Sequence, residues 1–375
     1  MRQQNNGQYF ENRELELTPS HIVMMGTSLN APGGMTSVVQ TLRAGGLFQA
    51  AHVTYLASYS GKGVFTQLGV FGAALVRLLG MLLRRNVVLV HVHSASRGSF
   101  WRKSIACVCA RLFGTPYVFQ IHSGEFPTFY HQECGNIAKW WVRNTLSNAA
   151  AVICLTEFWQ REIATIAPNA RTSVIGNPVE VPPTLRKARS SVRNVLFLGR
   201  LRQKKGVFDL VRSIPMVDRP NVKFILAGDE DAHGVMALAK ELDVADQVIL
   251  PGWVDGEKKQ AMLADADVFV LPSYYEGFPV GILEAMANGI PIVTTPVGGV
   301  ADVVNDRHHA LLVQPGDVAG LAEAIRMLVD GPEIRSALRE AAYHRVADNY
   351  AVPVIVSRYL ALYVSVMKVK SGVGL

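Results

Sequence analysis

Short apolar runs rich in valine, isoleucine and leucine alternate along this chain with longer segments of helical periodicity. This alternation is typical of parallel sheets covered by helices, so the chain is predicted to be an α/β protein. The predicted strands are His21–Met25, Val87–His91, Tyr117–Ile121 and Ala151–Leu155 in the first half, and Val195–Leu198, Lys223–Ala227, Gln247–Leu250, Val268–Leu271 and Pro291–Thr294 in the second.

Two domains of similar size are expected, because 375 residues exceed what one ordinary core holds. A cluster of glycine and proline residues at Ile175–Pro183 marks the connection between them. The predicted division is an N-terminal domain over residues 1–185, a second domain over 186–350 and a final helical segment over 351–375.

Charge is distributed unevenly between the halves. Residues 1–187 hold 17 lysines and arginines against 8 glutamates and no aspartate, a net charge of +9, whereas the remainder holds 20 against 22. A basic domain suits nucleic acid, anionic lipid headgroups or an acidic acceptor. No recognised nucleic-acid-binding motif occurs, so nucleic acid is not expected and an anionic membrane is the stronger interpretation.

An apolar segment, Val64–Leu83, is followed directly by Arg84 and Arg85. Its length approaches that of a membrane span, but Gln67 and Arg77 argue against a spanning helix. Two interpretations remain open. The segment is either a core helix that precedes a strand, or an interfacial helix, apolar on one side and anchored by basic residues.

The cysteines have no zinc-ligand spacing and are predicted to be small buried thiols: Cys107, Cys109, Cys134 and Cys154. The polar N-terminus lacks the apolar core of a signal peptide. We therefore expect a cytoplasmic protein, peripheral at the inner face of the cytoplasmic membrane.

Two carboxylates, Glu276 and Glu284, flank a turn that follows the predicted strand Val268–Leu271. The turn, Gly277–Pro279, is expected to open a helix from about Val280. Ligands of open α/β sheets bind at the carboxyl ends of strands, and a helix N-terminus offers free N–H groups to an anion. This layout suits a sugar linked to a nucleotide diphosphate. Alternatively, the first glutamate is a turn residue and the second is favoured by the helix dipole.

This pair with its Gly-Phe-Pro-x-Gly interior resembles the signature of glycosyltransferase family 4, whose members are retaining enzymes of the GT-B fold. The resemblance is strong over about residues 190–330 and weak in the N-terminal half. It implies two Rossmann-like, doubly wound parallel-sheet domains facing a cleft, with the last helix, around Val354–Lys368, crossing back onto the first domain. The matching segments are Gly199–Leu201, Lys205–Gly206, Ala227–Gly228, Pro251–Val254, Glu284–Ala287, Pro291–Val293 and Gly298–Gly299.

By this resemblance, Arg200 and Lys205 reach the diphosphate and stabilise the charge that builds on the leaving oxygen. For these two residues alone, a basic surface loop is the alternative. The resemblance also implies that Glu276 holds hydroxyls of the donor sugar and that Glu284 accepts hydrogen bonds from the ribose diol. The remaining implied donor-binding residues are Gly33, Gly34, Gly199, Val254, Gly277, Phe278, Pro279, Val280 and Gly281.

His122 follows the predicted strand Tyr117–Ile121 and resembles the family histidine that faces the reacting sugar. It is the fourth predicted catalytic residue, beside Glu276, Arg200 and Lys205; the alternative is a core histidine with satisfied hydrogen bonds. His91 and His93 also lie at a strand end and are expected to line the acceptor cleft. Their spacing suits a metal, but no third ligand is evident.

Neither a metal nor a cofactor is expected. Asp265 with Asp267, and Asp229–Asp231, have the acid-x-acid spacing of metal-dependent glycosyltransferases. The first pair precedes a strand, however, and so lies at the wrong end of the sheet. In the family that the chain resembles, Arg200 and Lys205 would do the electrostatic work of a metal.

The predicted reaction is retaining hexosyl transfer, in which the acceptor hydroxyl attacks from the front side and the departing phosphate oxygen takes its proton. GDP-mannose is the first expectation for the donor, followed by UDP-glucose, UDP-galactose and UDP-N-acetylglucosamine. The expected acceptor is lipid-linked or a polysaccharide repeat. Alternatives are a soluble transferase acting on a small metabolite, a phosphorylase or epimerase on the same scaffold, and a non-catalytic GT-B partner subunit.

Overall fold

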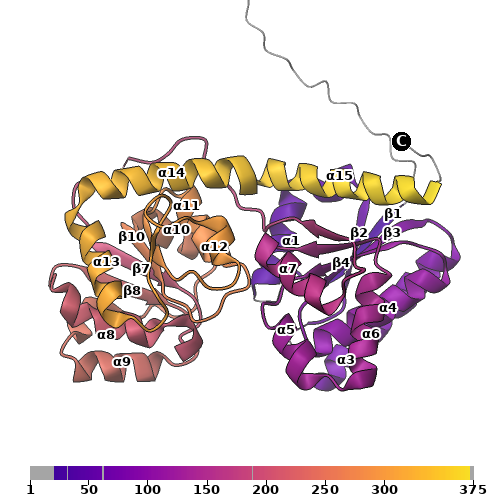
Figure 1. Ribbon diagram of the computed structural model, residues 1–375, viewed down its shortest axis with the longest axis horizontal. Coiled ribbons are helices and arrows are strands. Elements are labelled where there is room, and N and C mark those ends of the chain that lie inside the picture. Colours follow the sequence, from indigo (N-terminus) through magenta and orange to yellow (C-terminus); the bar gives the residue numbers. More distant parts are fainter. Residues whose placement is uncertain (1–20, 32, 61–62, 188, 372–375) are drawn as a thin grey trace, which may run out of the picture.

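A computed structural model describes residues 21–31, 33–60, 63–187 and 189–371, which form two α/β domains side by side (Figure 1). Every pairing of neighbouring strands in the two six-stranded sheets is parallel. The first sheet has the order β2-β1-β3-β4-β5-β6 and the second β12-β11-β10-β7-β8-β9. The strands are β1 His21–Gly26, β2 Val53–Ala57, β3 Val87–Ser94, β4 Tyr117–Ile121, β5 Ala151–Cys154, β6 Thr172–Val174, β7 Asn194–Leu198, β8 Lys223–Ala227, β9 Val248–Ile249, β10 Val268–Leu271, β11 Ile292–Thr294 and β12 Leu311–Leu312.

Both faces of the first sheet are buried, because alternate residues of β1 enter different cores. Val23 and Met25 pack with residues of α3, α4, α6 and α7, while Ile22 and Met24 pack with residues of α1, α2 and α15. The helices of this domain are α1 Gly34–Ala44, α2 Leu47–Ala50, α3 Val64–Leu83, α4 Gly98–Leu112, α5 Phe126–Thr128, α6 Asn136–Ser147 and α7 Glu157–Ile166, with a π-helical turn at Phe129–Glu133.

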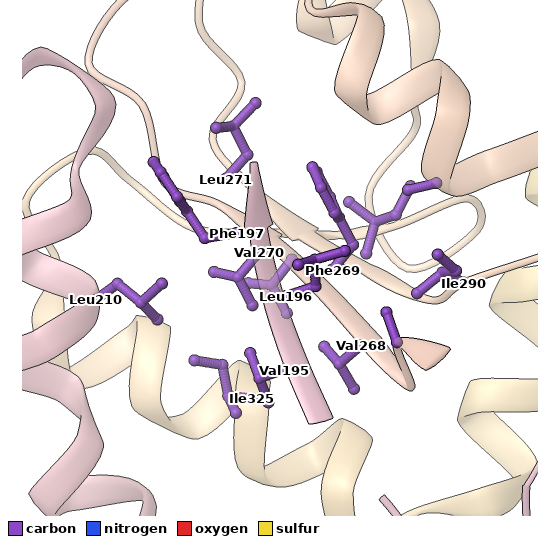
Figure 2. Close-up of a cluster of buried hydrophobic side chains, with 14 of the residues drawn as sticks. Val195, Leu196, Phe197, Leu210, Val268, Phe269, Val270, Leu271, Ile290 and Ile325 are labelled. Atoms are coloured by element: carbon purple, nitrogen blue, oxygen red, sulfur yellow. The ribbon is translucent and has the colours of Figure 1, made fainter. Parts of the chain in front are cut away.

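In the second domain, β7 and β10 lie at the centre of the core (Figure 2). Their residues are almost entirely apolar, which suits strands covered on both faces. The surrounding helices are α8 Val207–Val217, α9 Ala232–Glu241, α10 Gly256–Asp265, α11 Val280–Ala287, α12 Val300–Val303, α13 Val318–Asp330 and α14 Pro332–Tyr350, with 3₁₀ turns at Gln203–Lys205 and Ala245–Gln247.

The chain crosses between the domains twice, and the two crossings are hydrogen-bonded to each other. Val179 N–H donates to Tyr350 O at 2.9 Å, and Val352 N–H donates to Val179 O at 3.1 Å. Beyond the second crossing, α15 (Val352–Ser371) runs along the first domain (Figure 1). There Ile355 and Tyr359 are fully buried against the first sheet.

The α/β class and all nine predicted strands are confirmed, with ends that shift by up to three residues. Sequence patterns missed the short strands β6 and β12 and the partly exposed β2. Of the two interpretations of Val64–Leu83, the core helix describes one side only: Ala74, Leu78 and Leu82 pack in the core, but only 17% of the window Thr66–Leu83 is buried. Within the part of the chain that the structure describes, this is the one helix long and apolar enough to cross a membrane.

Candidate active site

The predicted site residues of the second domain gather where its strand order reverses. β7 has β8 on one side and β10 on the other, so the chain leaves these central strands in opposite directions and opens a crevice at their carboxyl ends. The segment Gly199–Lys205 follows β7, and the segment 272–279 follows β10 and leads into α11. Lys205 and Glu276, which are 71 positions apart in sequence, thereby meet in one loop cluster.

Glu276 lies at the bottom of this cluster, 5% exposed. Its Oε1 accepts hydrogen bonds from Lys205 Nζ at 2.7 Å and from Ser273 Oγ at 2.6 Å. Lys205 remains partly exposed, and an ammonium has three hydrogens to donate. The pair therefore presents a positively charged donor to the crevice while the carboxylate is held in a single orientation.

Two glycines allow the backbone to approach this ion pair closely. Gly206 has φ +70°, and a Cβ there would lie 2.0 Å from Pro272 O. Gly298 has φ +53°, and a Cβ there would lie 2.0 Å from Glu276 O. Any side chain at either position would move the loop that carries Glu276 or the loop that carries Lys205.

Seven predicted donor-binding residues line one cavity of about 730 Å³ between the domains. They are Gly33, Gly34, Gly199, Val254, Val280, Gly281 and Glu284. Glu284 Oε1 accepts a hydrogen bond from Lys259 Nζ at 2.6 Å, a partner that sequence reasoning missed. The first N–H groups of α11 have no acceptor within the helix and lie beside this cavity. The cavity thus offers backbone donors, the carboxylates of Glu284 and Asp255, and the ammonium of Lys259.

Phe278 is used for packing rather than for lining the cavity. Its ring lies 5.6 Å from that of Tyr350 and is buried in the second domain's core. Its carbonyl accepts a hydrogen bond from Asn177 Nδ2 at 3.5 Å, which ties the turn to the connection between the domains. The neighbouring Gly277 and Pro279 continue the same turn into α11.

Arg200 also lies at the end of β7, but acidic side chains hold it. Its Nη1 donates to Glu230 Oε1 at 3.1 Å, and Asp229 lies 4.0 Å from its Nε. Asp231 caps α9 by accepting from Gly234 N–H at 2.9 Å. The acidic run Asp229–Asp231 is therefore occupied with protein partners.

The other acid-x-acid pair lies at the opposite end of the sheet, where sequence reasoning placed it. Asp267 accepts from the N–H groups of Arg193 at 2.8 Å and Asn194 at 3.0 Å, at the start of β7. Asp265 pairs with Arg189 at 2.6 Å. Among the described residues, no group of three or more histidines, cysteines or acids could hold a metal ion.

The two domains touch at the loops that carry His122 and Glu276. A Cβ on Gly124 would lie 3.0 Å from Gly277 Cα, and a Cβ on Gly277 would lie 3.1 Å from Gly124 N, so a side chain at either position would push the two loops slightly apart. Tyr275 hydroxyl donates to Gly124 O, and Trp159 Nε1 donates to Gly277 O. These contacts bring the loop of His122 in the first domain next to the loop of Glu276 in the second.

Behind His122 lies a buried stack of histidine rings. His93 Nδ1 is 2.8 Å from His122 Nε2, and its ring stacks on His91 with 4.4 Å between centroids. The expectation that His91 and His93 line the acceptor cleft is wrong, because both are fully buried. Burial lowers the pKa of His91 and of His122 to about 3, so the rings are neutral at physiological pH.

The final helix supplies hydroxyl groups to this stack. Tyr363 hydroxyl lies 2.7 Å from His91 Nδ1, and Gln120 Oε1 is 3.1 Å from His91 Nε2. Tyr359 hydroxyl donates to the same amide oxygen at 2.9 Å. With that oxygen as acceptor, His91 carries its hydrogen on Nε2 and accepts from Tyr363 on Nδ1.

Sequence patterns also failed to identify a buried lysine next to the histidine stack. Lys103 of α4 is 1% exposed, and its Nζ donates to Ser99 Oγ at 3.2 Å. Burial and, to a lesser extent, the charge of nearby Arg102 lower its pKa to about 7. Its charge in turn lowers the pKa of His93 and of His122. No pattern in a single sequence distinguishes this lysine from an exposed one.

Comparison with known proteins agrees with this geometry. A family model described as "Glycosyltransferase Family 4" matches residues 20–181, and one described as "Glycosyl transferases group 1" matches residues 186–345. Each match takes in one of the two domains. The chain belongs to the GT-B glycosyltransferases. The fold and family expected from the turn between Glu276 and Glu284 are thereby confirmed.

Individual relatives of this glycosyltransferase are distant. It is 29% identical over 259 residues to a glycogen synthase of Mycobacterium tuberculosis, covering 65% of this chain and 62% of that protein. It is 31% identical over 208 residues to the lipopolysaccharide core biosynthesis glycosyltransferase LpsE of Rhizobium meliloti, covering 55% and 59%. The chain thus spans less than two thirds of either relative.

A solved structure of sucrose-phosphate synthase from Thermosynechococcus elongatus superimposes with a TM-score of 0.78. The superposition covers 93% of the glycosyltransferase and all of that chain, at 19% sequence identity. At this identity the likeness establishes the shared GT-B fold alone.

Proposed function

We propose that this glycosyltransferase is a retaining hexosyltransferase that uses a nucleotide-diphosphate sugar and glycosylates a lipid-linked or polysaccharide-repeat acceptor. The observation that carries the proposal is the buried Glu276–Lys205 pair at the point where the domains meet. In this proposal Lys205, with Arg200, stabilises the departing diphosphate, while Glu276 holds the sugar hydroxyls. His122 supports the sugar from the other domain by a hydrogen bond.

Front-side attack is supported by the pairing of the acids near the crevice. Glu276 is bound to Lys205 and Ser273. Glu125, in the facing loop, is bound to Arg97 at 2.6 Å and Lys204 at 3.1 Å. A carboxylate that is engaged in this way is a poor nucleophile for the sugar's far face. The acceptor hydroxyl therefore attacks on the side from which the diphosphate leaves, and the leaving oxygen takes its proton.

The test is slow hydrolysis of a donor panel by the purified protein, with and without a metal chelator. GDP-mannose is the first donor to try, followed by UDP-glucose, UDP-galactose and UDP-N-acetylglucosamine. We expect one donor to be cleaved with retention of configuration at the released sugar, and at an unchanged rate with the chelator. Hydrolysis with inversion, or only with added metal, would contradict the mechanism.

If none of the donors in the panel is hydrolysed, the binding of nucleotides is measured instead. Titration with UDP and GDP then distinguishes a donor site that needs its acceptor from a partner subunit without catalysis. Binding of neither nucleotide would refute the assignment of the cavity lined by Gly199, Val254 and Glu284.

We also propose that the enzyme acts in the cytoplasm at the inner face of the membrane, through the surface formed by α3, α4 and α6. These helices are neighbours and contain no acidic residue. Their large exposed apolar side chains are Leu68, Val76, Leu83, Ile105, Leu112, Ile137 and Trp140. Exposed Arg77, Arg111 and Arg143 lie on the same helices, a combination that suits an anionic lipid surface.

Vesicle flotation tests this surface. The native protein is expected to bind vesicles containing anionic lipid and to bind neutral vesicles much less. Trp140→Gln is expected to lower the bound fraction at least fivefold, since burying an aromatic ring contributes about 2 kcal/mol. Ile249→Gln, an exposed apolar position of the second domain, is the matched control. Equal losses from the two variants would exclude a specific membrane face.

A further inference from the structure

An open apolar groove of about 900 Å³ lies between α4 and α6 on the first domain. Trp101, Ile105, Ile137 and Trp141 form its walls. Ile137 is 84% exposed and Ile105 is 41% exposed, although both are branched apolar side chains. A surface of this kind on a soluble domain marks a site that an apolar ligand covers.

The polar groups between the two tryptophan rings are already satisfied within the protein. Trp141 Nε1 donates to Ser104 Oγ at 3.0 Å, and Ser104 Oγ donates to Trp101 O at 2.9 Å. The wall between the tryptophans therefore presents mainly carbon to a ligand, with Trp141 Nε1 and the Ser104 hydroxyl engaged within the protein. A hydrocarbon chain fits such a wall, whereas a sugar would lose hydrogen bonds to water there without replacing them.

The groove begins close to the proposed reaction site. The loop before α4 carries Ser96, whose Oγ lies 3.3 Å from Ser123 Oγ in the loop of His122. Ile105 is seven residues beyond Gly98, the first residue of α4, which is about 10 Å along the helix axis. A phosphate group and one sugar bridge a distance of this order between a lipid chain in the groove and the reacting hydroxyl.

A basic residue directly follows a groove residue on each of the two helices, and an acceptor phosphate needs such positive charge. Lys139 follows the groove residue Ala138, and its Nζ lies 5.7 Å from the centroid of the Tyr130 ring. Arg102 follows Trp101 and lies over the Tyr59 ring. With no acid on α4 or α6, an anionic headgroup at this place meets only positive charge from these helices.

We propose that the groove between α4 and α6 binds the hydrocarbon chain of a lipid-phosphate acceptor and so directs the acceptor sugar toward the loop of His122. This inference rests on the proposed function, because it names the class of lipid that the acceptor carries. It is separate from general membrane contact, since the groove holds one chain without a bilayer.

The test measures binding of farnesyl phosphate and isopentenyl phosphate by calorimetry, without vesicles and below the concentration at which the longer probe forms micelles. Both probes carry the same headgroup and differ only in chain length. The native protein is expected to bind the longer chain at least tenfold more tightly. Ile137→Gln is expected to reduce this preference to less than threefold.

Leu112→Gln is the matched control, because Leu112 is also an exposed apolar residue of α4, 79% exposed, and does not line the groove. It should leave the chain-length preference unchanged. The proposal that the groove binds the hydrocarbon chain would be overturned in either of two cases. The native protein could bind both probes with equal affinity, or the two variants could lose the chain-length preference equally. Donor hydrolysis on the same samples is expected to be unchanged. If every sample lacks both donor hydrolysis and binding of UDP and GDP, while the chain-length preference is present, the proposed function is refuted and the groove proposal stands.

Discussion

Replacing Glu276 by glutamine is expected to lower the turnover of the donor sugar by about 10²- to 10³-fold. Glutamine keeps the shape and one acceptor oxygen, but it removes the charge that holds Lys205 Nζ at 2.7 Å. The lysine would then be free to leave the position from which we propose that it stabilises the diphosphate. The variant should fold, because Lys205 is 31% exposed and gains water when its partner is lost.

The measurement is kcat for the donor identified in the hydrolysis panel, together with the free energy of unfolding in urea. Glu284→Gln is the comparison within the same motif. It is expected to raise KM more than it lowers kcat, because we propose that Glu284 binds the ribose and not the reacting sugar. Normal turnover in Glu276→Gln would remove this residue from the proposed mechanism.

Replacing Lys205 by alanine is expected to lower kcat/KM by about 10²- to 10³-fold, since one charged donor to the leaving group is lost. The chain provides an adjacent control in Lys204. That lysine pairs with Glu125 at 3.1 Å and is 71% exposed, so its ion pair contributes at most about 1 kcal/mol. Lys204→Ala is therefore expected to change kcat/KM by less than about fivefold.

A double-variant cycle distinguishes a functional pair from two independent residues. If Glu276 and Lys205 act together, the double variant should be much more active than the product of the single effects predicts. Additive losses would mean that the 2.7 Å contact has no part in catalysis. Comparable losses in Lys204→Ala and Lys205→Ala would show that general positive charge, and not one position, serves the leaving group.

Besides packing on the first domain, α15 makes hydrogen bonds with the buried network of the histidine stack. Tyr359 and Tyr363 reach the buried rings from the end of the chain, 239 and 272 residues away in sequence from Gln120 and His91. The helix that joins the two domains thereby also contacts the network beneath His122.

Local sequence patterns predicted the central strands and the turn between Glu276 and Glu284. A central parallel strand such as β10 is apolar throughout, and a glycine- and proline-containing turn stops it in any context. The short outer strands β6 and β12 carry too few residues to produce such a pattern. Their existence depends on the neighbouring strand that they pair with.

The sequence by itself thus determined the α/β class, the central strands and the motif that contains the two glutamates, because each of these rests on a few consecutive residues. The tertiary structure alone decided that Lys205 binds Glu276, that Lys259 binds Glu284 and that His91 and His93 are buried. It also decided that only 17% of the window Thr66–Leu83 of α3 is buried. These features arise where segments far apart in the chain come into contact. Burial, charge pairing and pKa depend on such contacts, so no local pattern of residues encodes them.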